Sequence, residues 1–111
     1  MKYLKTYEAI KDKPQIGDYA LCKPESGIIV YDIINKLHNF IDNNIGEIIN
    51  IEYIGKNYKN TFYNIRYNNI PEELKNFFYE NTKYFHENDI LQFSSNKEEL
   101  EAYIQSKKYN L

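Results

Sequence analysis

The chain has 111 residues, of which 42% are apolar and 16% are aromatic, and its formal charge is −2. This length and apolar content predict one domain with a single modest core. No apolar run is long enough to span a membrane, and we expect no secretory signal at the N-terminus. A single cysteine, Cys22, excludes an internal disulfide, so we expect a cytoplasmic protein.

Residues 1–13 are predicted to be an N-terminal appendage, with apolar side chains at the spacings of a short amphipathic helix. Pro14 ends this segment, because the residue before a proline is disfavoured in the α conformation. A strand is predicted to begin near Gly17 and to end before Pro24. Within it, Cys22 is predicted to be a small buried apolar residue rather than a nucleophile.

The segment at 27–31 is β-branched and is typical of either a short strand or an extended loop. A helix is predicted over 32–43, where apolar residues recur at helical spacing. Asp32 is predicted to cap this helix, and Asn43 with Asn44 to stop it. His38 is predicted to lie at the boundary of the apolar face. It is not a metal ligand by this interpretation, because the chain has only one other histidine and no cysteine pair.

The chain is organised around residues 45–67, which predict a hairpin of two antiparallel strands. Apolar and polar residues alternate in both halves, as they do in strands with one buried face. The link between the halves contains Gly55, Asn57 and Asn60, which tolerate a positive φ and let the chain reverse. The inward rows are predicted to be Ile49, Ile51 and Tyr53 in the first strand and Tyr63, Ile65 and Tyr67 in the second.

Two helices are predicted beyond the hairpin. The first begins at Pro71 and is about two turns long. Between the helices, a polar turn at 86–89 leads into a strand at 90–93. The second helix covers 95–108 and carries a capping-box pattern in Ser95 and Glu98. The predicted apolar faces are Leu74, Phe77 and Phe78 in the first helix and Leu100, Tyr103 and Ile104 in the second.

The predicted strands contain the stretches G-D-Y-A-L-C, I-G-E-I-I-N-I, Y-N-I-R-Y and H-E-N-D-I-L-Q-F. Glycine opens the first and lies near the start of the second, and it eases the bends at the corners of a small barrel. This pattern resembles SH3-like barrels of the Tudor and KOW kind. The resemblance implies an α+β fold in which residues 15–94 form a small SH3-like antiparallel β-barrel with short helical insertions, followed by the C-terminal helix.

The run from Ile45 through Pro71 to Tyr103 is also similar to a group of small uncharacterised proteins from phages and mobile elements of AT-rich bacteria. The abundance of Asn, Ile, Lys and Tyr fits this origin, since A- and T-rich codons encode all four. This resemblance implies no catalytic residue. It implies instead a role as an inhibitor of a host defence system, for example a CRISPR effector.

The sequence does not predict an enzyme. It has no glycine-rich phosphate loop, no H-E-x-x-H or C-x-x-C motif, and no serine in a nucleophile elbow. The carboxylate pairs at Glu72–Glu73 and Glu98–Glu99 fall in the first turns of helices, where the helix dipole accounts for them. We therefore expect no cofactor and no metal.

The preferred hypothesis is a non-enzymatic protein-binding module. Its contacts are predicted at Tyr58 and Phe62, because aromatic residues anchor interfaces, or at Glu72 and Glu73, if the partner presents a basic channel. The alternative is a nucleic-acid-binding barrel, in which Tyr58, Phe62 or Tyr63 stacks on bases, half of the hairpin aromatics face inward, and Lys56, Lys59 and Arg66 lie nearby. The net charge of −2 disfavours this alternative. A methyl-lysine cage built from clustered tyrosines is a third hypothesis.

Overall fold

The protein is described from a computed structural model, which covers residues 13–24 and 32–109, with the backbone alone at 58 and 109. The predicted appendage, apart from its last residue, and the segment at 27–31 lie outside the described residues. The elements are β1 (Tyr19–Cys22), α2 (Asp32–Asn43), β2 (Gly46–Ile54), η2 (Lys56–Tyr58), β3 (Asn60–Arg66), η3 (Glu72–Phe77), β4 (Thr82–His86), η4 (Glu87–Asp89), β5 (Ile90–Ser94) and α3 (Lys97–Tyr109).

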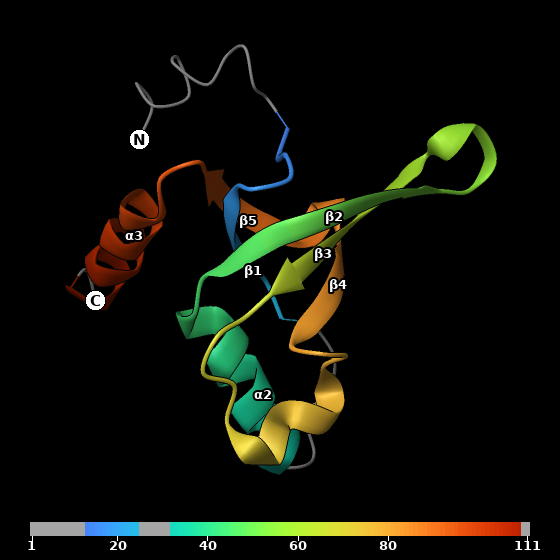
Figure 1. Cartoon of the computed structure of the whole chain (residues 1–111). Coiled ribbons are helices and arrows are strands. Elements are labelled where there is room, and N and C mark those ends of the chain that lie inside the picture. Colours follow the sequence, from blue (N-terminus) through green and yellow to red (C-terminus); the bar gives the residue numbers. More distant parts are fainter. Residues whose placement is uncertain (1–12, 25–31, 110–111) are drawn as a thin grey trace.

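The strands form one antiparallel sheet in the order β4-β3-β2-β1-β5 (Figure 1). This confirms the predicted α+β class with an antiparallel sheet and a C-terminal helix. The prediction of a closed barrel is not met by the described strands, because β4 and β5 are the two edges of an open sheet. The three-residue η4 carries the chain from one edge to the other without a ladder between them.

The predicted hairpin is confirmed as β2 and β3, but its inward row is wrong at one position. A bulge between Ile48 and Asn50 inserts Ile49 as an extra residue in β2. The insertion changes the parity of the strand, so Ile48, fully buried, faces the core in place of Ile49. Tyr53 shares the inward face but lies where the hairpin extends past the core, and its side chain is 58% exposed.

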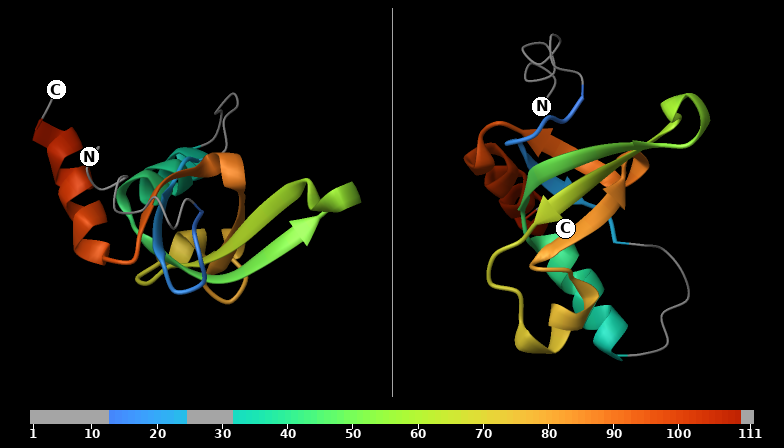
Figure 2. Two further views of the ribbon diagram at one scale, coloured as in Figure 1. Left: turned by 90° about the horizontal axis from the view of Figure 1, so that it is seen from above. Right: turned by 45° about the vertical axis from the view of Figure 1, so that its right-hand side comes forward.

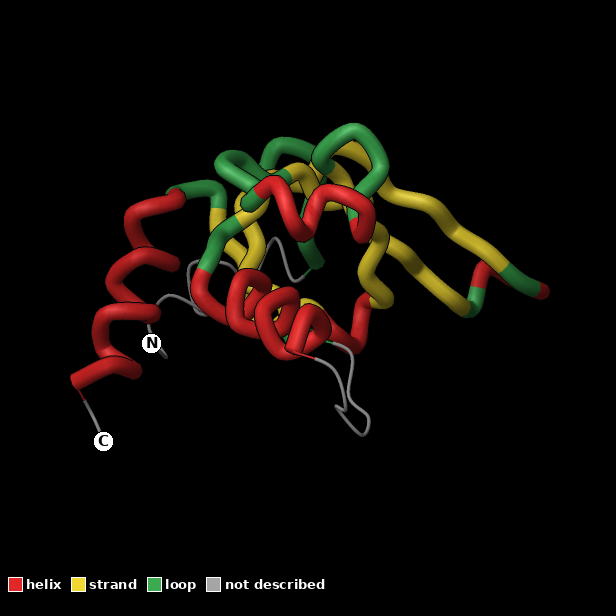
Figure 3. Tube along the Cα trace, turned by 90° about the horizontal axis from the view of Figure 1, so that it is seen from below, coloured by secondary structure: helices red, strands yellow, loops and turns green. Residues whose placement is uncertain are grey.

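The main core lies between the inner face of the sheet and the pair formed by α2 and η3, which lie side by side across it (Figure 3). At its centre, the rings of Phe40, Tyr67 and Phe78 meet edge to face, with centroids 5.5 to 6.0 Å apart. The buried position of Cys22 in this core is as predicted. The residues of α2 and η3 that are buried here are Leu37, Phe40, Ile41 and Leu74.

A second, smaller contact covers the opposite side of β1. Successive side chains of a strand point to opposite faces, so Leu21 points away from the main core that Ala20 and Cys22 enter. Helix α3 packs over β1 and β5 on this side, and its Leu100 is buried. β1 is therefore enclosed on both faces, which explains why three consecutive residues in it are fully buried.

Helix α2 has the predicted bounds and the predicted stop. The side-chain amide of Asn43 donates to the carbonyl of Asn39, and that of Asn44 donates to the carbonyl of Phe40, both at 2.8 Å. These bonds satisfy carbonyl groups that the last turn of a helix leaves without partners. The helix predicted after Pro71 is a 3₁₀ helix, with Leu74 buried as expected.

The predicted capping box of Ser95 and Glu98 is wrong. The carboxamide oxygen of Asn96 accepts from the backbone N–H of Glu98 at 3.0 Å, so Asn96 caps α3. Ser94 supports this end, because its hydroxyl accepts from the backbone of Asn96 and donates to Glu99. Ser94, Ser95 and Asn96 are all residue types that commonly cap helices. Ser94 is the last residue of β5, and only the structure shows that Asn96 directly precedes the helix.

Candidate functional site

The face of β2, β3 and β4 that points away from the main core is the strongest candidate for a binding surface. Figure 2 shows that the β2–β3 hairpin projects away from both α2 and α3. The pairing registers place two rows of side chains across this face, and each row contains one side chain from each of the three strands. We define the outer face as Asn50, Asn64 and Tyr84 in one row and Glu52, Phe62 and His86 in the other.

A hydrogen bond across the width of the outer face holds its most exposed aromatic ring. The Tyr84 hydroxyl on β4 donates to Glu52 Oε2 on β2 at 2.9 Å, passing over β3. The bond to Glu52 is the main reason that the pKa of Tyr84 lies above its usual value. The Tyr84 side chain is 48% exposed and therefore presents a fixed ring to solvent.

The second aromatic contact on this face joins Phe62 to His86, whose rings meet at 81° with centroids 5.2 Å apart. His86 Nδ1 accepts from the backbone N–H of Asn88 at 3.1 Å. In the neutral ring, Nε2 therefore carries the proton, and it lies 3.3 Å from the Asn60 carboxamide oxygen. With both ring nitrogens engaged, the His86 ring is held in one orientation on the surface.

Of the residues predicted to bind, Phe62 and Arg66 lie on the same side of β3, but Arg66 forms an ion pair within the protein. Its guanidinium contacts Glu47 Oε1 at 2.9 Å, and both side chains are partly exposed. This pair neutralises the charge that the nucleic-acid hypothesis assigned to phosphate contact. Tyr63 is only 3% exposed and belongs to the core, so of the three residues offered for base stacking it is one that faces inward.

Glu72 and Glu73 lie on η3, away from the outer face (Figure 1). Each is paired with a lysine: Glu73 Oε2 lies 3.2 Å from Lys36 Nζ, and Glu72 Oε1 lies 3.5 Å from Lys75 Nζ. The predicted contact residues are thus divided between two surfaces. The side chain of Tyr58, at the hairpin tip, lies outside the described residues.

Sequence reasoning did not find Glu52, Tyr84 and His86. Glu52 and Tyr84 are separated by 31 intervening residues and meet only because β3 aligns β2 with β4. The alternation within β4 does indicate that Tyr84 and His86 share a face. No pattern in the sequence shows which residues of β2 lie opposite them, because the bulge at Ile49 shifts the register.

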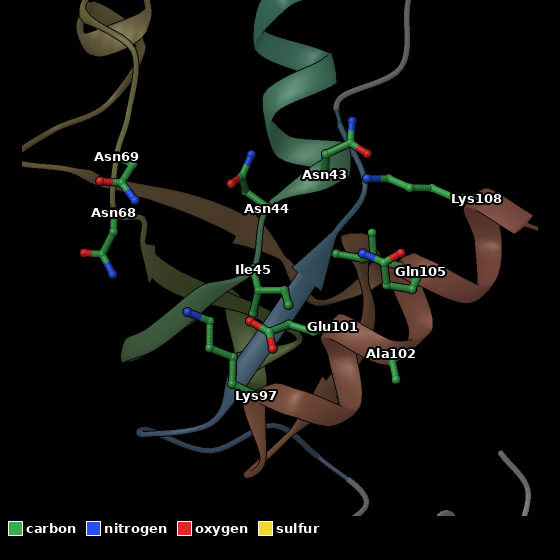
Figure 4. A pocket seen from close by; sticks show the side chains of 11 residues that line it. Asn43, Asn44, Ile45, Asn68, Asn69, Lys97, Glu101, Ala102, Gln105 and Lys108 are labelled. Atoms are coloured by element: carbon green, nitrogen blue, oxygen red, sulfur yellow. The ribbon is translucent and has the colours of Figure 1, made fainter.

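A polar cleft of about 520 Å³ lies between α3 and the chain that links α2 to β2 (Figure 4). Amide side chains dominate one wall, with Asn43 and Asn44 beside Asn68 and Asn69. The other wall belongs to α3 and carries Lys97, Lys108 and Glu101. No histidine, cysteine or serine lines this cleft, and its ionisable side chains are Lys97, Glu101 and Lys108.

The described residues contain no group of three His, Cys, Asp or Glu side chains able to hold a metal ion. Burial raises the pKa of the Cys22 thiol to about 12, and Tyr67 beside it also has a raised pKa, chiefly because of burial. A thiol with this pKa is almost fully protonated at neutral pH and is a poor nucleophile. This agrees with the prediction that Cys22 is structural.

Among the described residues, no helix has both the length and the apolar character to cross a membrane. Comparisons of the chain with protein-family models, with curated proteins and with solved structures find no match.

Proposed function

We propose that the protein is a non-enzymatic protein-binding module and that the outer face of β2, β3 and β4 is its interface. The observation that carries this proposal is the ordered aromatic surface formed by Phe62, Tyr84 and His86 on the side of the sheet that faces away from the main core. Aromatic residues are enriched at the centres of protein interfaces. Because side chains of this surface are held by Glu52 and Asn60, binding would cost little further ordering.

The partner we propose is an effector of a bacterial host defence system, for instance of the CRISPR type, met in the bacterial cytoplasm. This part rests on the sequence resemblance to phage and mobile-element proteins. The ion pairs of Glu72 and Glu73 argue against these carboxylates as the main contact with a basic channel, since each already faces a lysine. An interface anchored by aromatic residues is therefore the version that we favour.

For the scaffold, we propose an SH3-like arrangement. Two features support it. The strands β2, β3 and β4 form a consecutive meander while β1 joins β2 to β5, and a single 3₁₀ turn, η4, connects β4 to β5. In this arrangement α2 and η3 are insertions between strands. SH3-like barrels serve many unrelated functions, so the scaffold does not by itself choose a partner.

The test is affinity purification of the tagged protein from an AT-rich bacterial host, with and without nuclease, for wild type and three variants. We expect one stoichiometric protein partner that survives nuclease and that is lost with the double variant Phe62→Ala and Tyr84→Ala. Leu91→Ala removes an exposed apolar side chain from β5 and is the matched control, which we expect to retain the partner. Charge reversal at Glu72 and Glu73 is also expected to retain it.

Two results would overturn the proposal. Recovery of nucleic acid alone, or of partners lost on nuclease treatment, would favour the nucleic-acid-binding alternative, in which Phe62 stacks on bases and the exposed Lys56 and Lys59 contact phosphates. Retention of a protein partner by the Phe62→Ala and Tyr84→Ala variant, with loss on charge reversal in η3, would place the interface on η3 instead.

A further inference from the structure

The two neighbours of β2 accompany it over very different lengths. β1 pairs with it at Gly46 and Glu47, and the turn before β1 bonds to Ile48 in both directions, with N···O distances of 2.8 Å. β1 then leaves β2, whereas β3 continues beside it to Ile54. We call residues 50–54 the edge segment, which projects with the hairpin beyond the rest of the sheet (Figure 2).

The composition of the edge segment is unusual for a strand in this position. Proteins protect long sheet edges with lysine, proline or strands of minimal length, since an edge can template the pairing of another chain. The edge segment reads N-I-E-Y-I, with no lysine or proline and with Glu52 as its single charge. Ile54 is 49% exposed at its end. Apart from the bulge at Ile49, directly before its start, and the charge of Glu52, the edge segment has none of these protective features.

The side chains of the edge segment also define what an added strand must carry. Ile51 points to the core side of the sheet and is partly buried, whereas Glu52 points to the outer face. Residues that lie opposite each other in an antiparallel pair share a face and interact most strongly. An added strand therefore needs an apolar residue opposite Ile51 and a basic residue opposite Glu52, in alternation.

We propose that the edge segment binds an extended segment of a partner protein by strand addition, antiparallel to β2, and that this segment carries a basic side chain between two apolar ones. This proposal rests on the proposed function, since it specifies how a binding module would hold its partner. Backbone hydrogen bonds would supply affinity, and the alternating side chains would supply specificity.

The test uses a synthetic peptide, Ser-Gly-Thr-Val-Lys-Val-Thr-Gly-Ser, titrated into the isotopically labelled protein and followed by nuclear magnetic resonance. We expect the amide signals of residues 50–54 to shift and their hydrogen exchange to slow by about tenfold or more on saturation. The same peptide with Glu in place of Lys should bind at least about fivefold more weakly, because a cross-strand charge pair is replaced by repulsion. N-methylation of both valines and of the lysine, which blocks N–H groups on both edges of the peptide strand, should abolish binding.

The Glu52→Lys variant is the control that tests register and charge together. We expect it to reverse the preference, so that it binds the Glu peptide more tightly than the Lys peptide. Absence of shifts in residues 50–54 at about 1 mM peptide, or an unchanged preference in Glu52→Lys, would overturn the proposal. If the peptide fails while the Phe62→Ala and Tyr84→Ala variant still loses its natural partner, strand addition is wrong and the proposed function stands.

Discussion

At Gly46 a single methyl group would collide with the facing strand. A Cβ there would overlap Ile65 Cγ2 and approach Arg66 O to 3.0 Å and Tyr67 Cε1 to 3.2 Å. The sequence suggests this glycine as a barrel corner, but its backbone φ is not in the left-handed region. The structure shows a different reason for glycine, which is the close approach of β3 to the start of β2.

We predict that Gly46→Ala lowers the free energy of unfolding by about 3 kcal/mol, since overpacking against backbone and a buried side chain cannot relax easily. Urea unfolding measures this change. Gly17→Ala is the comparison, because Gly17 has a φ of +95° but open space around its Cβ position, and should cost about 1 kcal/mol. Equal costs for the two variants would show that steric overlap at Gly46 is not limiting.

Stability should fall at alkaline pH because of buried acidic groups. The Cys22 thiol has an ordinary pKa of 9.0 and a pKa of about 12 in the folded protein, owing to burial. Above pH 9 the unfolded chain loses this proton before the folded chain does, so unfolding becomes more favourable as pH rises toward 12. Its stabilising contribution is complete below pH 9, and the loss approaches about 1.4 kcal/mol per pH unit.

Urea unfolding of wild type and Cys22→Ala between about pH 8 and pH 11 measures this effect. Tyr67, whose pKa is also raised, contributes to the slope in both proteins. The variant has a lower starting stability but should lose less of it as pH rises. Parallel slopes for the two proteins would contradict a raised thiol pKa.

At the scale of elements, the bounds of α2 and the existence of the hairpin follow from periodicity in the sequence. The inward row of β2 does not, because nothing local distinguishes Ile48 from Ile49 as the residue that a bulge displaces. The predicted start of α3 is wrong for a similar reason, since Ser94, Ser95 and Asn96 are all residue types that can cap a helix. The sequence also does not predict the contact between Tyr84 and Glu52, because that contact depends on the register of three strands.

The cap of α3 can be tested directly. We predict that Asn96→Ala lowers the free energy of unfolding by about 1 kcal/mol, because the backbone N–H of Glu98 loses its acceptor. Ser95→Ala is the matched control and should change stability by less than about 0.5 kcal/mol. Thermal unfolding of both variants distinguishes them, and a larger effect at Ser95 would restore the capping box predicted from sequence.

The turn before β4 contains a strained residue. Glu80 and Asn81 have φ of 49° and 69°, and the residues on either side, Tyr79 and Thr82, bond to each other through both backbone groups. A left-handed conformation is costly for a residue with a long side chain. Glu80→Gly should therefore raise the free energy of unfolding by about 1 kcal/mol.

Calorimetry of Glu80→Gly beside Glu80→Ala checks this prediction, because alanine keeps the Cβ that causes the strain. We expect a higher melting temperature for the glycine variant only. An equal gain for both variants would assign the effect to removal of the carboxylate rather than to backbone strain.

For the whole molecule, the open sheet has two unequal halves. One half is enclosed, with β1 between the main core and α3. The other half consists of β2, β3 and β4, whose core side packs on the main core and whose hairpin projects beyond the rest of the sheet (Figure 2). Stability therefore resides in the first half and in the core beneath the sheet. We therefore expect substitutions on the outer face and in the edge segment to cost less stability than substitutions in the core.

The central claim is that the outer face holds a protein partner. The most direct measurement is the dissociation constant of the nuclease-resistant partner for wild type, for the Phe62→Ala and Tyr84→Ala variant, and for Leu91→Ala, with circular dichroism to confirm folding. We predict at least about a tenfold weakening for the double variant and no change for Leu91→Ala. An unchanged dissociation constant for a folded double variant would contradict it.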